Sequence, residues 1–433
     1  MVYVISKGGN PLMPCSNAIA RILLKENKAK VKYRTPFTIK LNYETTNYTQ
    51  ELSLGIDTGS DKLAASVTTI DDDIKKVLYK SEVEIRNDIT AKMTQRSKYR
   101  RNRRSRKTRY RAPRFLNREN STRTDRFNLT ITSKISGHIR EIEFIKKNLP
   151  ITKMVLECGQ FDMYLMKNPV LANPKVRHWG YQKGPNYGFA NTKAMVLNRD
   201  GYTCQCCKKK IGRMEVHHIV YQSNGGSDEA ENLITVCPKC HKEIHDGVRT
   251  LGHRGKKKGQ LKHATQMNSI RKQLLRRYPD AEETFGYVTK ENRQLLGLNK
   301  EHCIDACVIS AGGEPFVDND ILYVKKCVAD GDYQHYKGQH SEKKIDIGKI
   351  KGFRKFDKVE YFGKEYLIKG RMSTGYAILM DFDGNKVNFN SFPKGFKTPK
   401  MSNLRRVQAR CSCMTTEIRH NVTIDAEDIQ NIA

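Results

Sequence analysis

The sequence predicts a multidomain α/β protein, and three observations lead to this prediction. First, 433 residues exceed what one ordinary hydrophobic core organises, so two to four compact units are expected. Second, apolar strand-like runs alternate with segments of helical periodicity. Third, a segment rich in cysteine and histidine, Tyr202 to His245, predicts a small metal-stabilised unit of its own.

The formal net charge of +33 at pH 7 indicates the class of partner. Such an excess, with the basic residues clustered, predicts binding to a polyanion, and nucleic acid is favoured over the alternative of an anionic membrane surface. No run approaches the roughly 20 apolar residues that cross a bilayer. The segment Met1–Pro14 lacks the apolar core of a signal peptide, and twelve cysteines fit a reducing cytosol, so a cytoplasmic prokaryotic protein is expected.

Two cysteine pairs bracket the segment that is rich in cysteine and histidine. The pairs are Cys204-x-x-Cys207 and Cys237-x-x-Cys240, and two intervening residues let both sulfurs of a pair face one metal ion. A structural Zn²⁺ alone is the simplest interpretation of this spacing. Cys206 is not expected to be a ligand. A zinc ribbon, however, does not need the histidines that stand between and after these pairs.

The order His-His, Gly-Gly, Asn-Leu, Cys-x-x-Cys-His resembles the HNH nuclease motif, which has a ββα-metal fold. The resemblance implies that His218 is the general base and that His217 and His241 bind a catalytic Mg²⁺. It implies that Asn232 fixes the loop beneath the histidines, although an ordinary turn is the alternative for this residue. The chemistry is consistent with these roles, because a neutral imidazole can take a proton from water near physiological pH.

Carboxylates end or follow apolar segments at three distant places. Asp57 ends the first strand of Glu51–Ile70, Glu157 ends another predicted strand, and Asp305 shares a helix face with His302. An isolated Asp before a glycine is usually a turn residue, and a surface position is the ordinary alternative for the histidine. The three carboxylates and His302, taken in their order along the chain, resemble the RuvC-like branch of the ribonuclease H fold.

That resemblance implies that Asp57, Glu157 and Asp305 hold two divalent ions and that His302 helps to activate water. Two such ions stabilise the attacking and leaving oxygens of a phosphodiester. Carboxylate oxygens are hard ligands, so Mg²⁺ or Mn²⁺ is expected.

Between the first two carboxylates lies the strongly basic stretch Arg96–Arg118. It contains twelve Lys or Arg residues and no Asp or Glu. A run of this kind is often a solvated face, but this one lies inside the chain and predicts an arginine-rich helix, ending by Pro113, that contacts phosphates. The predicted nucleic-acid-binding residues are Arg96, Arg100, Arg101, Arg103, Arg104, Arg106, Lys107, Arg109, Arg111 and Arg114.

The N-terminal region predicts a small α+β unit, with a helix over Asn17–Asn27 and strands at Tyr3–Ile5, Pro11–Pro14 and Thr35–Tyr43. The order of the predicted parts resembles the plan of the IscB family, which are transposon-encoded RNA-guided nucleases related to type II CRISPR effectors. That plan has a RuvC core split in three, an arginine-rich bridge helix and an inserted HNH unit. The sequence of Pro11–Pro14, PLMP, matches the motif for which the IscB N-terminal domain is named. One departure is Thr58, where that family usually has proline.

The resemblance implies a division of the chain into eight parts. These are the N-terminal domain (1–50), RuvC-I (51–91), the bridge helix (92–118), RuvC-II (119–175), a connector (176–191), the HNH nuclease (192–249), a connector with RuvC-III (250–325) and a β-rich C-terminal region (326–433). A helix is expected over Asp125–Leu149, where isoleucines recur at helical spacing. The C-terminal region is expected to contact the guide RNA and a short target-adjacent motif, and the sequence nominates no base-reading residue there.

The implied activity is RNA-guided DNA cleavage by a monomeric ribonucleoprotein with a guide (omega) RNA. The HNH unit would cut the guide-paired strand and the RuvC unit the displaced strand, while base pairing supplies sequence specificity. Two alternatives stay open: an HNH homing or restriction-type endonuclease that needs no RNA, and a catalytically decayed nucleic-acid-binding accessory protein of a transposon.

Overall fold

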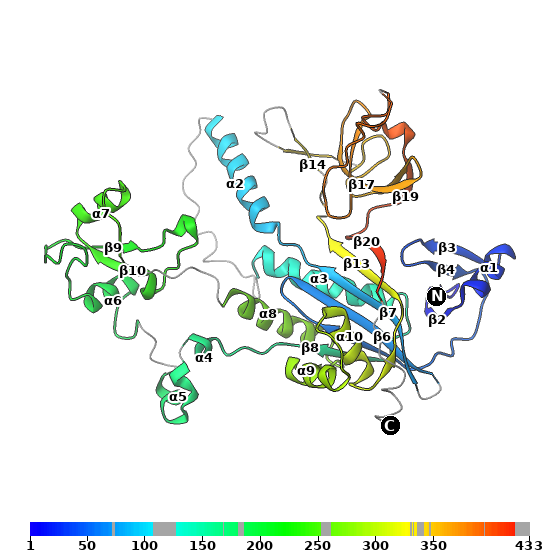
Figure 1. Ribbon diagram of the computed structural model, residues 1–433, viewed down its shortest axis with the longest axis horizontal. Helices are drawn as coiled ribbons and strands as arrows, with labels where there is room; N and C mark the ends of the chain where they lie inside the picture. The colour runs from blue at the N-terminus through cyan, green and yellow to red at the C-terminus, as the bar shows by residue number, and fades with distance from the viewer. Residues whose placement is uncertain are drawn as a thin grey trace. The chain divides into compact units, whose positions relative to one another are not determined.

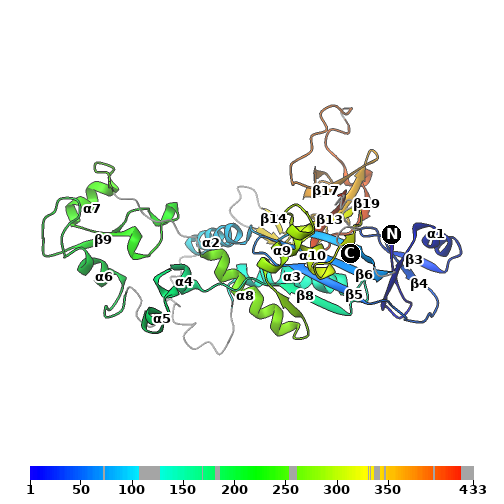
Figure 2. The same cartoon turned by 60° about the horizontal axis from the view of Figure 1, so that its bottom comes forward.

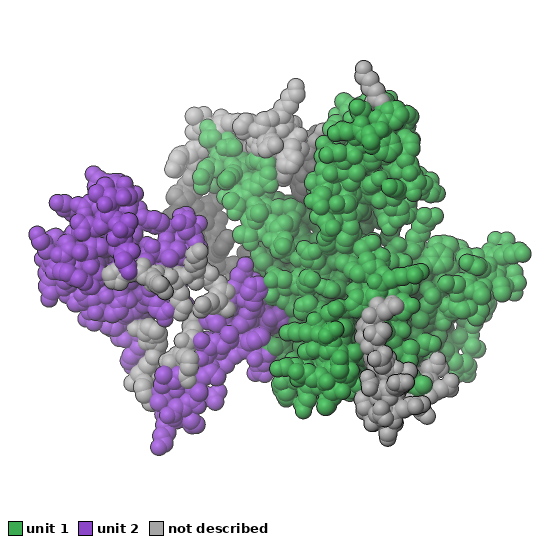
Figure 3. All heavy atoms as spheres, in the orientation of Figure 1, with its two compact units in different colours: residues 1–159, 269–433 green, residues 160–268 purple. Residues whose placement is uncertain are grey.

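The computed structural model forms two compact units, residues 1–159 with 269–433 and residues 160–268 (Figure 3). The described residues are 1–71, 74–106, 127–167, 169–180, 186–252, 261–329, 331, 333–335, 342–345, 348–393 and 395–420. Helices and strands alternate in both units, which confirms the predicted mixed α/β organisation. No helix among these residues is long and apolar enough to cross a membrane.

The N-terminal part of the first unit is a four-stranded sheet with one helix (Figure 1). Its elements are β1 (Val2–Ile5), β2 (Pro11–Cys15), α1 (Asn17–Lys25), β3 (Ala29–Tyr33) and β4 (Thr38–Leu41), in the sheet order β2-β1-β4-β3. The side chain of Ser16 caps α1 by accepting a hydrogen bond from the Ile19 N–H. The sequence predicts the helix and three of the strands but not β3, where four of the five residues are exposed.

The centre of the first unit is an eight-stranded mixed sheet. Its path is β11-β8-β5-β6-β7-β13-β20, and β12 also pairs with β7. The strands are β5 (Leu52–Asp57), β6 (Lys62–Asp71), β7 (Ile74–Glu84), β8 (Lys153–Glu157), β11 (Glu282–Thr284), β12 (Phe316–Val317), β13 (Ile321–Cys327) and β20 (Cys413–Arg419). β5, β6 and β7 run antiparallel, whereas β8 is parallel to β5 and β11 is parallel to β8. Figure 2 shows β5, β6 and β8 close together.

Two helices cover opposite faces of this sheet (Figure 1). On one face lies α10 (His302–Ala311), where the Thr68 hydroxyl donates to the Ser310 carbonyl across 2.7 Å. On the other lies α3 (Leu129–Lys146), whose Glu141 accepts hydrogen bonds from the side chains of Tyr79 and Ser81 on β7. The apolar periodicity of the predicted helix thus corresponds to the α3 face that packs on the sheet. Three further helices belong wholly or partly to this unit: α2 (Ile89–Arg106), α8 (Lys262–Arg277) and α9 (Gly286–Leu295).

A buried ion pair joins α3 to two strands of the sheet. Lys325 on β13 donates to both carboxylate oxygens of Glu141 at 2.8 and 2.9 Å, and both side chains are at most 4% exposed. Lys325 also donates to the Tyr79 hydroxyl at 2.7 Å. Removing one partner of such a pair leaves an uncompensated charge in the core.

We expect Lys325→Met to lower the free energy of unfolding of this unit by about 3–5 kcal/mol, because Glu141 would stay buried without its cation. Lys326→Met, at the next residue, is the matched control. The Lys326 side chain is 24% exposed and its ammonium pairs with Asp383, an interaction worth about 0–1 kcal/mol. Urea unfolding followed by circular dichroism measures both changes. Equal midpoints for the two variants would contradict a stabilising role for the buried pair.

The second unit contains a short antiparallel hairpin followed by a helix. β9 (Glu215–His218) pairs with β10 (Leu233–Val236), and α7 (Pro238–His245) follows directly. The ββα arrangement predicted for this segment is therefore present. The other helices of the unit are α4 (Met163–Lys167), α5 (Pro174–Gly180) and α6 (Thr192–Arg199), with the short turns η2 (Pro169–Ala172), η3 (Gln222–Asn224) and η4 (Ala230–Asn232).

The β-rich C-terminal segment forms a four-stranded antiparallel sheet with its own core. The order is β18-β17-β16-β19, from β16 (Lys358–Tyr361), β17 (Lys364–Arg371), β18 (Ala377–Met380) and β19 (Arg405–Gln408), with η6 (Met401–Asn403) beside it. A short pair, β14 (Tyr333–His335) and β15 (Glu342–Lys344), precedes it. After β19 the chain returns to the central sheet as β20, a pairing that the sequence analysis did not predict.

Candidate nuclease sites

The hairpin of the second unit brings the predicted histidines to one place. His218 is paired with Leu233 and His217 with Ile234, so the two adjacent histidines point to opposite faces of the hairpin. His217 is 3% exposed and packs against α7, where its ring lies 5.0 Å from the ring of His241, centroid to centroid. His218 is more exposed.

Three imidazoles can converge on one ion in this unit. One ring nitrogen from each of His217, His241 and His245 lies within 4.8 Å of the others. The Nε2 atom of His217 is buried and has no hydrogen-bond partner, as expected of a nitrogen that binds a ligand. Burial and the nearby charges of His241 and His245 lower the pKa of His217 to about 4, so this imidazole is neutral at physiological pH.

His245 is not among the ligands predicted from the sequence, although its spacing from His241 is a signal for it. His245 follows His241 by four residues on α7, and this spacing places both on one helix face. The donor set also bears on the identity of the ion. Three imidazoles favour a transition metal such as Zn²⁺ or Ni²⁺, and Mg²⁺, predicted from the resemblance, prefers oxygen ligands.

Carboxylates orient the imidazoles at this site. The Nε2 atom of His218 lies 3.0 Å from Asp228 Oδ1, and Nδ1 of His241 lies 2.5 Å from Glu215 Oε2. A carboxylate on one ring nitrogen fixes the tautomer and makes the other nitrogen a better ligand or base. His218 is therefore held apart from the three-histidine cluster, in a position suited to accept a proton.

Asn232 holds the loop that joins the two strands of the hairpin. Its amide oxygen accepts from the Val220 N–H at 2.9 Å, while its amide nitrogen donates to the carbonyls of Val220 and Ser227. A side chain at Gly226 would place its Cβ 1.8 Å from the Val220 oxygen, so only glycine fits beside this network. The Asn232 side chain thus ties Val220 and Ser227 together within this loop.

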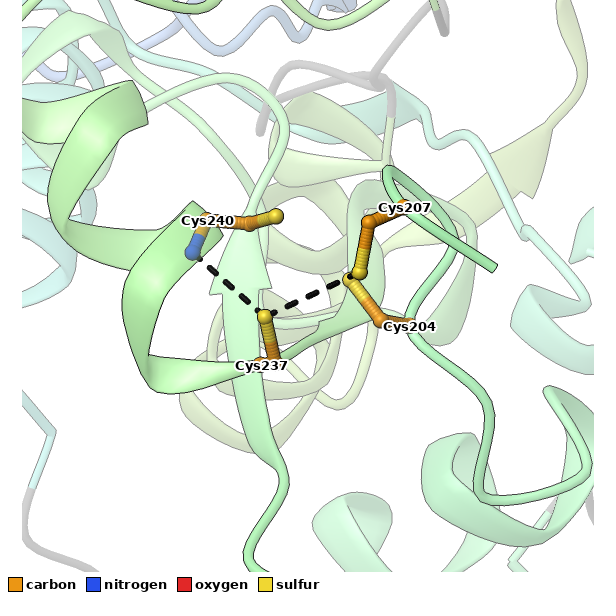
Figure 4. A group of neighbouring side chains, drawn as sticks. All are labelled: Cys204, Cys207, Cys237 and Cys240. Carbon is orange, nitrogen blue, oxygen red and sulfur yellow. Dashed lines mark hydrogen bonds between the residues drawn. The ribbon is translucent and has the colours of Figure 1, made fainter. Parts of the chain in front are cut away.

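Four cysteine sulfurs form a second group of potential ligands in the same unit. Cys204 and Cys207 lie on a turn, Cys237 caps α7 and Cys240 lies in its first turn (Figure 4). All four sulfurs lie within 4.8 Å of one another. Burial opposes ionisation of Cys204, but hydrogen bonds from backbone N–H groups, including that of Cys207, lower the pKa of its thiol to about 6. Four converging thiols fit a tetrahedral structural Zn²⁺, and Cys206 is outside the group.

We expect Cys237→Ser to remove the zinc and to unfold residues 204–245 locally, because the four-cysteine site loses one of its ligands and metal binding stabilises the fold of such small units. Cys206→Ser is the matched control and should keep its zinc. Zinc per chain, measured by mass spectrometry, distinguishes the variants. Unchanged zinc in Cys237→Ser would exclude the four-cysteine cage.

The predicted carboxylates of the central sheet meet at one end of adjacent strands. Asp57 on β5 and Glu157 on β8 are direct partners in the parallel register. The Nδ1 atom of His302 lies 2.6 Å from Asp57 Oδ2, which links α10 to the same place. Asp305 lies one turn further along α10, and its side chain is 15% exposed. Segments separated by as many as 245 residues therefore contribute to one polar site.

The electrostatics of this site show that the three carboxyls influence one another. Burial raises the pKa of Glu157 to about 7, and the charges of Asp57 and Asp305 act in the same direction. Burial and Asp57 also raise the pKa of Asp305, while the hydrogen bond to Asp57 raises the pKa of His302. Glu157 Oε2 is buried without a hydrogen-bond partner. An unsatisfied buried carboxylate oxygen among other acids fits a divalent-cation site.

The three carboxylates do not all converge within 4.8 Å, in contrast to the cysteine and histidine groups. A single ion would require that convergence, whereas a two-ion cluster, with its ions about 3.5–4 Å apart, distributes its ligands more widely. Arg293 on α9, which the sequence analysis did not single out, lies with its Nε 2.8 Å from Asp305 Oδ1. Its guanidinium thus holds one carboxylate in place.

A further group of potential ligands lies beside His302. Glu301, Cys303 and His420 offer atoms within 4.8 Å of one another. His420 also lies 3.3 Å from the ammonium of the fully buried Lys80, which pairs with Asp318. A cation this close opposes metal binding. We interpret the group as a polar network that fastens the end of β20 to α10.

The arginine-rich stretch is helical as far as the structure describes it. α2 spans Ile89–Arg106, and Arg96, Arg100, Arg101 and Arg104 are exposed on it, whereas Tyr99 is buried. Four of the predicted contact residues, Lys107, Arg109, Arg111 and Arg114, lie outside the described residues. Of Arg103 and Arg106 the structure gives only the helical backbone. The exposed guanidiniums are suited to phosphate contacts.

Two protein families match the chain. The family described as "RRXRR protein" matches residues 2–184. The sequence motif that gives this family its name, two arginines on each side of any residue, occurs in α2 at residues 100–104, Arg-Arg-Asn-Arg-Arg. The family described as "HNH endonuclease" matches residues 204–247, the segment with the histidine and cysteine clusters. The arginine-rich family and the HNH domain in one chain confirm the resemblance found in the sequence. The chain is an IscB-like protein.

Individual relatives of this IscB-like chain cover parts of it. Anaredoxin from Nostoc sp. is 35% identical over 66 residues, 15% of this chain and 86% of anaredoxin, so over that stretch the two belong to one family. The Type IV methyl-directed restriction enzyme EcoKMcrA from Escherichia coli is 34% identical over 61 residues, 12% of this chain and 22% of that enzyme.

Among solved structures, Streptococcus thermophilus Cas9 in complex with AGGA PAM matches with a TM-score of 0.36 and 11% identity. The match covers 68% of this chain and 57% of Cas9. The chain thus spans less than two thirds of the Cas9 and EcoKMcrA chains. A TM-score this low does not establish a common fold for the whole chain.

Proposed function

We propose that this IscB-like protein is an RNA-guided DNA endonuclease with two nuclease sites. The observation that carries the proposal is the presence, in separate units, of a histidine cluster in an HNH endonuclease domain and of an Asp57–Glu157 pair with His302. The sheet order β7-β6-β5-β8-β11, with only β5–β7 antiparallel, supports a ribonuclease H-like, RuvC-type core. An accessory protein with decayed sites would not need either group of ionisable side chains.

At the HNH site, His218 takes the proton of the attacking water, and Asp228 stabilises the resulting imidazolium. His217, His241 and His245 would hold a divalent ion, which supplies positive charge for the scissile phosphate. Asn232 keeps the loop, and with it His218, in position. We assign this site to the guide-paired DNA strand.

At the sheet site, Asp57, Glu157 and Asp305 would hold Mg²⁺ or Mn²⁺, and we assign it to the displaced strand. His302 is half-exposed and hydrogen-bonded to Asp57, so it can move a proton to or from water there. The exposed arginines of α2 bind the phosphates of the guide RNA, whose base pairing selects the target.

The test is to purify the full chain from a host that expresses its surrounding genomic region, sequence the RNA that copurifies, and add plasmid DNA carrying a matching target. We expect both strands to be cut only with the RNA and a divalent ion present. If the protein is treated with ribonuclease before the DNA is added and still cuts at the same target sequence, guidance by RNA is refuted. It would favour the second candidate, a restriction-type HNH endonuclease, which the similarity to EcoKMcrA supports.

A further inference from the structure

Two stacked aromatic side chains lie at the start of α9, directly after β11. The rings of Phe285 and Tyr287 are nearly parallel, at 6° to each other, with their centroids 6.0 Å apart. Tyr287 is 70% exposed. Its hydroxyl makes no hydrogen bond to any residue that the structure describes. One side of this pair therefore faces solvent as a flat aromatic surface.

The backbone places this surface next to the candidate catalytic carboxylate Glu157. β11 pairs in parallel with β8, and Thr284 is the direct partner of Glu157. The chain then turns so closely over the carboxylate that a Cβ at Gly286 would lie 3.0 Å from Glu157 Oε1. Because Phe285 and Tyr287 flank this glycine, the aromatic pair lies at the border of the sheet site.

Positive charge accompanies the exposed ring. Lys290 follows Tyr287 by three residues on α9, so the two side chains share a helix face, and Lys290 is exposed. An aromatic ring with a neighbouring cation is the combination that holds single-stranded nucleic acid, since the ring stacks on a base and the cation neutralises a phosphate. Bases inside a duplex are not accessible to such a ring.

We propose that Phe285 and Tyr287 form a stacking platform for a base of the single DNA strand that enters the sheet site. The inference rests on the proposed function and assigns to that site a positioning element. A base held on Tyr287 fixes the nucleotide whose neighbouring phosphate lies at Glu157. Because every base has a π-face, the platform accepts any sequence, as a nuclease needs when its specificity comes from an RNA.

Tyr287→Ala in the full chain with its RNA tests this assignment. We expect cleavage of the displaced strand to slow by roughly 5- to 150-fold, the effect of losing one base stack, with the guide-paired strand cut at the original rate. Tyr287→Phe keeps the ring and should restore cleavage. Tyr48→Ala, at a tyrosine that is 91% exposed, is the matched control and should change neither rate.

A second readout does not depend on cleavage. A single-stranded DNA oligonucleotide containing 2-aminopurine should lose fluorescence when its base stacks on Tyr287, and the loss should be smaller in Tyr287→Ala. Asp57→Asn should keep the quenching while it abolishes the displaced-strand cut. If Tyr287→Ala loses the displaced-strand cut but neither the original protein nor the variant quenches the fluorescence, the platform is wrong and the proposed function stands. If the original protein quenches the fluorescence but cuts neither strand, the proposed function is wrong and the platform stands.

Two other results would overturn the inference. Unchanged displaced-strand cleavage and unchanged quenching in Tyr287→Ala would show that the ring holds no base. Equal slowing of both cuts, together with a lower melting temperature, would show that Tyr287 packs against another part of the protein.

Discussion

Asp57→Asn is expected to abolish cutting of the displaced strand and to leave cutting of the guide-paired strand intact. The amide keeps the size of the side chain but removes the negative charge from a residue that is 7% exposed and next to Glu157 in the sheet register. It also replaces the carboxylate that holds His302 at 2.6 Å. Loss of several kcal/mol of transition-state stabilisation corresponds to a rate decrease of at least about 10³-fold.

The measurement uses duplex DNA with a different fluorophore on each strand, so that both nicks are followed in one reaction. Asp88→Asn is the matched control, because Asp88 is 42% exposed and pairs with Arg86 and Lys92 rather than with a residue of the sheet site. Its variant should cut both strands normally. If Asp57→Asn cuts the displaced strand at the original rate, Asp57 has no part in catalysis.

The sequence alone predicted best the features that depend on short spacing. The two Cys-x-x-Cys pairs, the adjacent histidines and Asn232 lie within one small unit, so their order along the chain nearly determines their geometry. The α3 helix was likewise predictable, because its apolar side recurs with the helical period and packs on the sheet. In both cases local covalent geometry carries the information.

Contacts made across the fold could not be read from spacing. Nothing near Arg293 in the sequence indicates that its guanidinium meets Asp305 from a neighbouring helix. Lys325 and Glu141 each look like surface residues, yet they neutralise each other inside the core. A periodic pattern tells which side of an element is buried and not which partner covers it.

The strand β20 illustrates the same limit over a longer range. It follows a separate β-rich segment, but it pairs along its whole length with β13, some 90 residues earlier in the chain. Its alternating Thr, Glu and Arg residues fit an edge strand of any sheet. The choice of partner depends on where the chain returns after β19, and this is a property of the tertiary structure.

His218→Ala is expected to cut only the displaced strand, whereas Asp57→Asn is expected to cut only the guide-paired strand. Removing a general base typically slows a proton transfer by about 10²- to 10⁴-fold, so the guide-paired strand should stay intact while the displaced strand is still cut. The hairpin should keep its fold, because the side chain of His218 is 29% exposed and Asn232, rather than His218, holds the loop. Strand-specific labels again separate the two nicks.

Two further variants make this result specific. Asp228→Asn should slow the same cut by a smaller factor, since the imidazole would stay in place without the charge that stabilises its protonated form. His263→Ala changes an exposed histidine on α8 and should have no effect on either strand. Loss of both cuts in His218→Ala would show that this residue does not serve one strand alone.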